Sequence, residues 1–324
     1  MNLLSPLLAL LVTVLAIAVI LFSKFSKAIQ DIPNDRSLHS KPVPRTGGIA
    51  LVLGVFAGWG LMAVSIPWWL WLPLFMLFLV SLRDDMRSLP VKQRLLAHLA
   101  GAALLVAGSG VIDQHGWLVA VAVFLLAAWM IDLYNFMDGS DGLAGGMALF
   151  GFSCYAIAAL IVNDDTLAIL CFTIAAAALG FLLFNFHPAK IFMGDAGSIP
   201  LGFLVAALGV WGWLRDDWAP WFPLLVFSPF IVDASVTLLK RTLRGAKITE
   251  AHREHYYQRA VQMGWGHRNV ALAEYVLMLG VGASALWSQQ SGFTLQMGLG
   301  WGGIYVLLML VLDVRWKKFK RKTT

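Results

Sequence analysis

The sequence is poor in charged residues and in cysteine. Only 13% of its 324 residues are Asp, Glu, Lys or Arg, whereas 59% are hydrophobic, and the mean hydropathy is +0.76. A soluble globular chain carries about 25% charged residues, so the composition excludes that class. The two cysteines, Cys154 and Cys171, lie in apolar runs without metal-site spacing, which assigns them to packing rather than to a thiolate metal site.

Several sequence signals for other classes are also missing. The chain has no P-loop and no GxSxG nucleophile elbow, and the histidines between 252 and 267 lack the partners of a zinc site. No basic residue precedes the first apolar run, which argues against a cleaved signal peptide and predicts a retained first helix.

What the chain does contain is a series of long apolar runs. Because a crossing needs about 20 mainly apolar residues at 1.5 Å rise per residue, we predict an all-α, polytopic membrane protein with about eleven helices in a single domain, 1–324. The predicted segments lie near residues 3–23, 47–65, 67–82, 95–112, 117–134, 144–162, 166–185, 199–214, 220–239, 270–287 and 294–312.

Basic residues are concentrated in one set of connections. Of the 24 Lys and Arg residues, only Arg215 lies outside five segments. These segments are residues 24–46, 83–94, 186–198, 240–269 and 315–324. The positive-inside rule places them in the cytoplasm, with the N-terminus in the periplasm and the C-terminus in the cytoplasm. This placement explains the net charge of +6 without nucleic-acid binding.

The stretch NFMDGSDGLAGG, residues 135–146, brings polar groups to the end of an apolar run. Asn135, Asp138 and Asp141 recur at three-residue spacing and share one face if the helix continues. The glycines alone are explained by a plain turn, but the three oxygen-bearing side chains are not. Oxygen ligands suit Mg²⁺, which shares its coordination with substrate phosphates, so we predict a site for Mg²⁺ and a nucleotide diphosphate.

Other acids lie in the predicted cytoplasmic connections. Asp84 and Asp85 end the third run among the cations Lys92 and Arg94, where they either serve the site or face water in a topogenic loop. Asp195 lies before the eighth run and is a candidate metal ligand or a helix cap. The acids of the two external pairs, Asp164-Asp165 and Asp216-Asp217, are expected to be solvated turns.

Two acids lie deeper in the apolar runs. Asp132 is expected to form a buried hydrogen bond. For Asp233 we keep two roles open, a functional one or a structural one with a partner. Loop 241–269 groups basic and aromatic side chains that suit phosphates and a nucleobase or sugar face, or a membrane surface. They are His252, Arg253, His255, Tyr256, Tyr257, Arg259 and His267.

The order of these motifs resembles a known family. DIPNDRSLHSKPVPRTGG, LRDD, NFMDGSDG, FMGDAGS and HREHYYQR follow one another over nearly the whole chain, and the chain resembles the polyprenyl-phosphate N-acetylhexosamine-1-phosphate transferases, or glycosyltransferase family 4. The resemblance implies a bacterial inner-membrane enzyme with about ten or eleven helices and a cytoplasmic cleft formed by loops near 83–94, 135–146, 186–198 and 241–269. By analogy it also suggests a homodimer.

The resemblance implies roles for individual residues. Asn135 and Asp195 would bind Mg²⁺, with Mn²⁺ as an alternative, and Asp84 and Asp85 would lie near the lipid phosphate; Asp195 and this pair are the predicted catalytic residues. The predicted substrate-binding residues are Asp138, Asp141, Lys92, Arg94, Arg253, His255 and Arg259. Tyr256, Tyr257 and Gln258 stand where many members continue a histidine cluster, so a three-histidine role does not transfer.

The implied reaction joins a UDP-N-acetylhexosamine to undecaprenyl phosphate and releases UMP, within a membrane-lipid environment. The changed histidine cluster favours initiation of O-antigen or another surface glycan over the peptidoglycan-type phospho-MurNAc-pentapeptide transfer, which remains the alternative within the family. A lipid or glycan transporter is the alternative from another class, with Asp132 and Asp233 as a proton relay.

Overall fold

The computed structural model describes residues 3–23, 29–33, 38, 41–62, 65–247 and 252–323. Within them the fold is helical apart from one short antiparallel strand pair, β1 with β2. In chain order the elements are α1 (Leu4–Phe22), β1 (Gln30–Asp31), β2 (Val43–Pro44), α2 (Gly47–Gly60), α3 (Trp68–Met86), α4 (Val91–Ser109), α5 (Val111–Phe136), α6 (Leu143–Ile161), α7 (Asp165–Asn185), α8 (Asp195–Leu214), α9 (Trp221–Val226), α10 (Ser228–Leu243), α11 (Tyr256–Ala260), the π-helical turn η2 (Val261–Trp265), α12 (Gly266–Ser291) and α13 (Thr294–Thr323).

The all-α prediction is confirmed, and each predicted apolar segment overlaps at least one helix, although α2 already ends at Gly60 within the predicted segment 47–65. The ninth segment is broken into α9 and α10 at Phe227, because Pro229 cannot donate the backbone hydrogen bond that would continue α9. In the described part of the chain, seven helical stretches are long and apolar enough to cross a membrane. The protein is therefore a multi-span membrane protein, while the count of eleven crossings and the orientation of the termini stay predictions.

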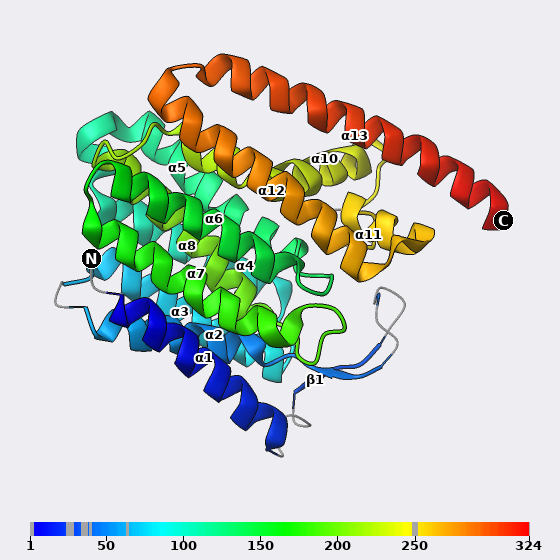
Figure 1. The fold of residues 1–324 in the computed structure, drawn as a ribbon, viewed down its shortest axis with the longest axis horizontal. Helices are drawn as coiled ribbons and strands as arrows, with labels where there is room; N and C mark the ends of the chain where they lie inside the picture. Colours follow the sequence, from blue (N-terminus) through cyan, green and yellow to red (C-terminus); the bar gives the residue numbers. More distant parts are fainter. Residues whose placement is uncertain are drawn as a thin grey trace.

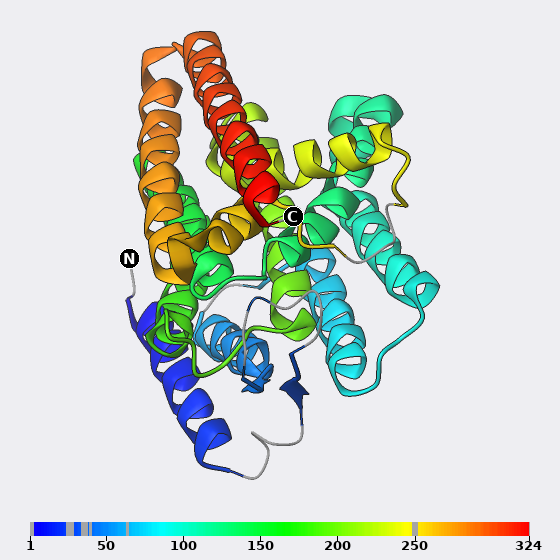
Figure 2. The same cartoon turned by 90° about the vertical axis from the view of Figure 1, so that its right-hand side faces the viewer.

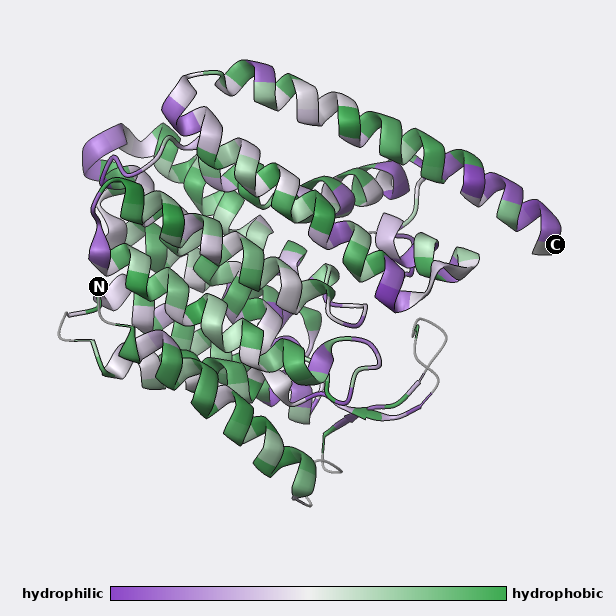
Figure 3. Ribbon diagram, viewed as in Figure 1, coloured by the Kyte–Doolittle hydropathy of each residue, from purple (hydrophilic) through white to green (hydrophobic). Residues whose placement is uncertain are grey.

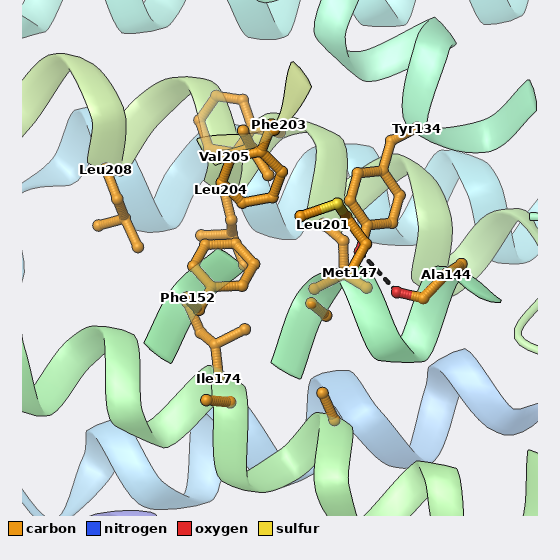
Figure 4. Close-up of a cluster of buried hydrophobic side chains, with 14 of the residues drawn as sticks. Tyr134, Ala144, Met147, Phe152, Ile174, Leu201, Phe203, Leu204, Val205 and Leu208 are labelled. Atoms are coloured by element: carbon orange, nitrogen blue, oxygen red, sulfur yellow. Dashed lines mark hydrogen bonds between the residues drawn. The ribbon is translucent and has the colours of Figure 1, made fainter. Parts of the chain in front are cut away.

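Helices α1 to α8 pack into a layered bundle (Figure 1). Helix α7 packs against α1, α2 and α6, and α8 packs against α3 and α5. Close packing in the interior is visible around Tyr134, Phe152 and Leu204, where the Tyr134 hydroxyl donates a hydrogen bond of 2.8 Å to the Ala144 carbonyl oxygen (Figure 4). This bond satisfies a buried polar group and joins the end of α5 to the start of α6.

Helices α12 and α13 form a hairpin on the outside of the bundle (Figure 2). Helix α13 contacts α12 and α11. Only 6% of its most apolar stretch is buried within the chain. Its C-terminal end extends beyond the bundle and is hydrophilic, in contrast to the apolar helix before it (Figure 3). The exposed apolar surface of α13 suits contact with lipid.

Backbone hydrogen bonds join two distant loops at the end of the bundle near β1. The N–H of Phe192 donates to the Pro44 carbonyl oxygen at 2.7 Å, and the N–H of Gly47 donates to the Phe192 carbonyl oxygen at 2.9 Å. These bonds attach the segment before α8 to the segment before α2. They thereby place the first turn of α8 at the end of the bundle where β1 and α11 also lie (Figure 1).

Candidate active site

A pocket of about 770 Å³ opens at this end of the bundle. Its lining comes from all four loops that the sequence pattern singled out, together with residues of loop 29–46. The polar and aromatic lining residues include Arg45, Asp84, Arg94, His98, Asp132, Asn135, Phe136, Asp138, Ser140, Asp141, Phe192, Asp195, His252, His255, Tyr257, Gln258 and His267. Segments far apart in sequence therefore converge on one cavity.

The two aspartates at the end of α3 point in different directions. Asp85 is buried and does not line the pocket, since its side chain is only 1% exposed. Its carboxylate accepts hydrogen bonds from the backbone N–H groups of Asp195 at 3.1 Å and Ala196 at 2.9 Å, and from the Arg45 guanidinium at 2.6 Å. Asp85 thus caps helix α8 from another helix, because the N-cap residue Gly194 has no side chain to do so.

Asp84 does line the pocket, where it lies beside Arg94 and Asp195. Its carboxylate accepts hydrogen bonds from the backbone N–H of Leu89 at 2.5 Å and from Arg94 Nη1 at 3.1 Å. The same Arg94 nitrogen lies 3.6 Å from Asp195 Oδ2. One guanidinium therefore lies between two carboxylates from separate helices and attracts both.

Asn135 is connected to the first turn of α8 through a serine. The Ser198 hydroxyl donates a hydrogen bond of 2.7 Å to Asn135 Oδ1. Gly194, directly before this turn, has a φ of +72°, and an added Cβ would lie 2.7 Å from the Arg45 carbonyl oxygen and 2.8 Å from Asp85 Oδ2. Only glycine allows this backbone conformation and close approach, so Gly194 fixes the start of α8, whose first turn carries Asp195 and Ser198.

Asp138 occupies the turn between α5 and α6 and lines the pocket. Its carboxyl group has no hydrogen bond or ion pair to any residue that the structure describes. Burial, and next the Asp85 carboxylate, raise the pKa of Asp138 to about 7. Its carboxyl group is therefore poorly compensated by the protein and available to a bound molecule or cation.

Asp141, by contrast, is occupied within the protein. One of its oxygens accepts a hydrogen bond from the backbone N–H of Ala189 at 3.1 Å and lies 2.7 Å from His187 Nδ1. The next residue, Gly142, has a φ of +76°, and its N–H donates to Asn185 Oδ1 at 2.9 Å. These contacts attach the 135–146 turn to the segment after α7, so Asp141 orders the wall of the pocket.

Loop 252–258 forms another wall of the pocket. Asp233 accepts hydrogen bonds from the backbone N–H groups of Tyr256 at 2.8 Å and Tyr257 at 3.0 Å. Of the two roles that the sequence left open for Asp233, the structure therefore shows a structural one with partners. The Tyr257 hydroxyl donates to the Phe136 carbonyl oxygen at 3.1 Å, which closes the wall against the end of α5.

Four of the predicted site residues do not line the pocket. Asp85 caps α8, as described. Lys92 and Arg253 are exposed at the protein surface. Arg259 lies 3.0 Å from Asp313 on α13 and packs over the Tyr256 ring. The other predicted residues line the pocket: Asp84, Arg94, Asn135, Asp138, Asp141, Asp195 and His255.

The lining also contains residues that the sequence did not single out. Arg45 belongs to a loop about 40 positions before Asp85, and no local pattern announces their ion pair. His98 lies 2.7 Å from Asp132, which gives Asp132 the hydrogen-bonded role expected of it. A basic residue before a pair of glycines, as in Arg45-Thr46-Gly47-Gly48, is the only local signal that could have identified Arg45.

The donor atoms in the pocket fit a hard divalent cation that arrives with phosphates. Among the described residues no group of three or more His, Cys, Asp or Glu side chains is arranged to hold a metal alone. Mg²⁺, however, typically takes only one or two protein carboxylates and completes its shell with water and phosphate oxygens. Around the first turn of α8, the four carboxyl groups of Asp84, Asp85, Asp138 and Asp195 outnumber the two guanidinium groups of Arg45 and Arg94. This surplus of negative charge would be offset by a cation beside Asn135 and Asp195.

Comparisons with known proteins cover most of the chain. The sequence model described as Glycosyl transferase family 4 matches residues 67–212. A probable undecaprenyl-phosphate N-acetylglucosaminyl 1-phosphate transferase of Bacillus subtilis is 28% identical over 299 residues, which cover 87% of this chain and 81% of that protein.

Two further relatives have related names. A decaprenyl-phosphate N-acetylglucosaminephosphotransferase of Mycolicibacterium smegmatis is 30% identical over 295 residues, covering 75% of this chain and 71% of that protein. A phospho-N-acetylmuramoyl-pentapeptide-transferase of Listeria welshimeri is 32% identical over 164 residues, which is 48% of each chain.

Proposed function

The chain belongs to glycosyl transferase family 4, and from this premise we propose that it transfers the 1-phosphate of an N-acetylhexosamine from a UDP-sugar to undecaprenyl phosphate, with release of UMP. The observation that carries the proposal is the pocket in which Arg94 bridges Asp84 and Asp195 while Asn135 contacts the same turn of α8. Because the chain belongs to an enzyme family, we no longer retain the alternative that it is a lipid or glycan transporter.

We propose Mg²⁺ as the cofactor, held by Asn135 and Asp195 together with the diphosphate of the donor. When bound, it would neutralise charge on the phosphate oxygens, which is the main requirement of phosphoryl transfer besides positioning. The cations Arg45 and Arg94 would add donors for the phosphates. Asp138, on the turn after α5, would contact the nucleotide.

The chemistry proposed for the chain's own residues is positioning rather than strong base catalysis. A phosphate monoester with a second pKa near 6 is already about 90% dianionic at pH 7, so its deprotonation by a base recovers only about one power of ten in rate. Asp84 has both carboxylate oxygens engaged, by Leu89 and Arg94. We therefore assign Asp84 to the orientation of Arg94 at the attacking phosphate.

For the donor sugar we propose N-acetylglucosamine, because two relatives that align with three quarters or more of this chain carry that sugar in their names. The acceptor reaction would begin the synthesis of O-antigen or another surface glycan at the cytoplasmic face of the inner membrane. A peptidoglycan-type donor is the second candidate, since the Listeria relative matches about half of the chain. Homodimerisation and substitution of Mn²⁺ for Mg²⁺ stay predictions.

The test is release of UMP by the purified full-length protein in detergent. We expect turnover with UDP-N-acetylglucosamine and undecaprenyl phosphate in the presence of Mg²⁺, its loss with EDTA, and its recovery when Mg²⁺ is restored. Turnover with UDP-MurNAc-pentapeptide alone would assign the protein to the second candidate. The absence of UMP release across a panel of UDP-N-acetylhexosamines would overturn the proposal.

A further inference from the structure

A second, shallower hollow lies on the surface of helix α3. It measures about 290 Å³ and is lined by Leu79, Leu82, Arg83, Met86 and Arg87. None of these residues lines the large pocket. Leu79 and Met86 are 46% and 59% exposed. The hollow therefore combines apolar side chains and two guanidinium groups on one exposed helix face.

The two arginines of this hollow lack an internal counter-ion. Arg83 lies in the last turn of α3 and Arg87 is the residue at which this helix ends, and both side chains line the hollow. Neither guanidinium has a hydrogen bond or ion pair among the residues that the structure describes. By contrast, Arg45 and Arg94 are both paired with carboxylates.

The nearest acids in sequence cannot supply that counter-ion because they face elsewhere. Asp84 stands only three positions before Arg87, but it lines the large pocket, and the Asp85 carboxylate lies at the start of α8. Asp84 is bonded to Leu89 and Arg94, and Asp85 is bonded to the start of α8. An anion that binds both guanidinium groups would therefore come from outside the residues that the structure describes.

We propose that the hollow binds the phosphate group of an anionic phospholipid. Arg83 and Arg87 would donate hydrogen bonds to the phosphate, and Leu79, Leu82 and Met86 would contact the adjoining acyl chain. The charge of the site is complementary to such a headgroup, and guanidinium groups suit phosphate oxygens. Basic sites at the ends of membrane helices are typical positions for anionic lipids.

The occupant is a phospholipid rather than the acceptor lipid of the proposed reaction. The phosphate of that acceptor has to reach Asp195, whereas the hollow shares no residue with the pocket around Asp195. The bound phospholipid would hold the last turn of α3, from which Asp84 and Asp85 project. The inference does not depend on which sugar the enzyme transfers.

Native mass spectrometry of the purified full-length protein tests this site. Dioleoylphosphatidylglycerol and dioleoylphosphatidylcholine are titrated separately into the wild type and the Arg83→Gln/Arg87→Gln double variant. The matched control is Lys318→Gln/Lys322→Gln, which removes two exposed charges at the same spacing from α13. We expect preferential retention of phosphatidylglycerol by the wild type and the control, and an affinity about thirtyfold lower in the arginine variant, as two basic residues at an anionic surface predict.

Several results would overturn the proposal. They are equal retention of both lipids by the wild type, unchanged phosphatidylglycerol affinity in the arginine variant, or an equal loss in the lysine control, which would indicate diffuse attraction. Displacement of one phosphatidylglycerol by stoichiometric undecaprenyl phosphate, only when Arg83 and Arg87 are present, would assign the hollow to the acceptor. If the double variant does not fold, the exposed single change Arg87→Gln provides the same comparison with a smaller loss.

Discussion

The side chain of Asp85 caps the helix that Asp195 begins. Although 110 residues separate them, the backbone N–H of Asp195 donates a hydrogen bond of 3.1 Å to Asp85 Oδ1. The adjacent aspartates of α3 therefore have separate tasks: Asp85 holds α8 in place, and Asp84 lies in the pocket with Arg94. Mutation of each aspartate can distinguish these two roles.

We predict that Asp85→Ala destabilises the fold more than Asp84→Ala does. Removal of Asp85 leaves Arg45 and two helix N–H groups without their buried partner, and a cost on the order of 3 kcal/mol is expected for such a loss. Thermal unfolding in detergent measures the difference. Asp84→Ala should lose UMP release with the smaller fall in melting temperature; equal melting temperatures for the two variants would contradict the division of roles.

Asp195→Asn should abolish UMP release while leaving the protein folded. The change keeps the size of the side chain but removes the charge beside Arg94 and the proposed cation. In the absence of Mg²⁺ its melting temperature should equal or exceed that of the wild type, since repulsion from Asp84 and Asp85 is relieved. Asp165→Asn, also at the first residue of a long helix, is the matched control. Near-normal turnover of the Asp195 variant would refute the metal assignment.

Gly194→Ala should reduce both stability and turnover. The added Cβ would meet the Arg45 carbonyl oxygen and Asp85 Oδ2 at a position with positive φ, so the start of α8 has to move. Gly245→Ala is the control, because Gly245 has a similar φ of +77° but no atom within 4 Å of the added Cβ. Turnover and melting temperature are compared for both variants; equal effects would mean that the contacts around Gly194 are unimportant.

Acidification should destabilise the wall of the pocket through His252. Burial, then the neighbouring His255 and Arg241, lower the pKa of His252 from 6.5 to about 4. Between pH 6.5 and pH 4, His252 is protonated in the unfolded chain but stays neutral in the folded chain. The free energy of unfolding therefore falls progressively as the pH is lowered through this range. We predict that His252→Gln shows a smaller fall in melting temperature over this range. An identical pH dependence in wild type and variant would disprove the assignment.

Asp313 on α13 is predicted to position loop 252–259. Its carboxylate lies 2.5 Å from Lys240 Nζ and 3.0 Å from Arg259 Nη1. Helix α13 also contacts α12 and α11, and its Tyr305 hydroxyl lies 2.7 Å from the Ser228 hydroxyl of α10. Asp313→Asn should raise the KM for the UDP-sugar severalfold with a smaller change in kcat, because the wall that carries His255 loses an anchor while Asp195 is untouched. Recovery in Asp313→Glu would separate charge-dependent positioning from a general loss of stability, whereas unchanged kinetics in Asp313→Asn would contradict the prediction.

Most of the fold could be predicted because hydrophobicity is a local property. The apolar run that contains Tyr134 and the one that contains Phe152 each form a helix wherever they pack. The break at Phe227 was also foreseeable, since Pro229 changes the hydrogen bonding of its own helix whatever surrounds it. The start of α8 was harder to predict, because the side chain that caps this helix belongs to Asp85 and not to a residue near it in sequence.

The sequence by itself determined the helical membrane class, the family and the small set of acids from which the site is built, because apolar runs and motif spacing are properties of contiguous residues. Only the tertiary structure decided which acid does what. Asp84 and Asp85 are adjacent and identical, yet one lines the pocket and the other is buried under α8. Likewise, Arg94 reaches Asp195 while Arg259 is held by Asp313. A side chain's partners depend on the direction in which its helix face points and on what packs against it, and neither is encoded at the residue itself.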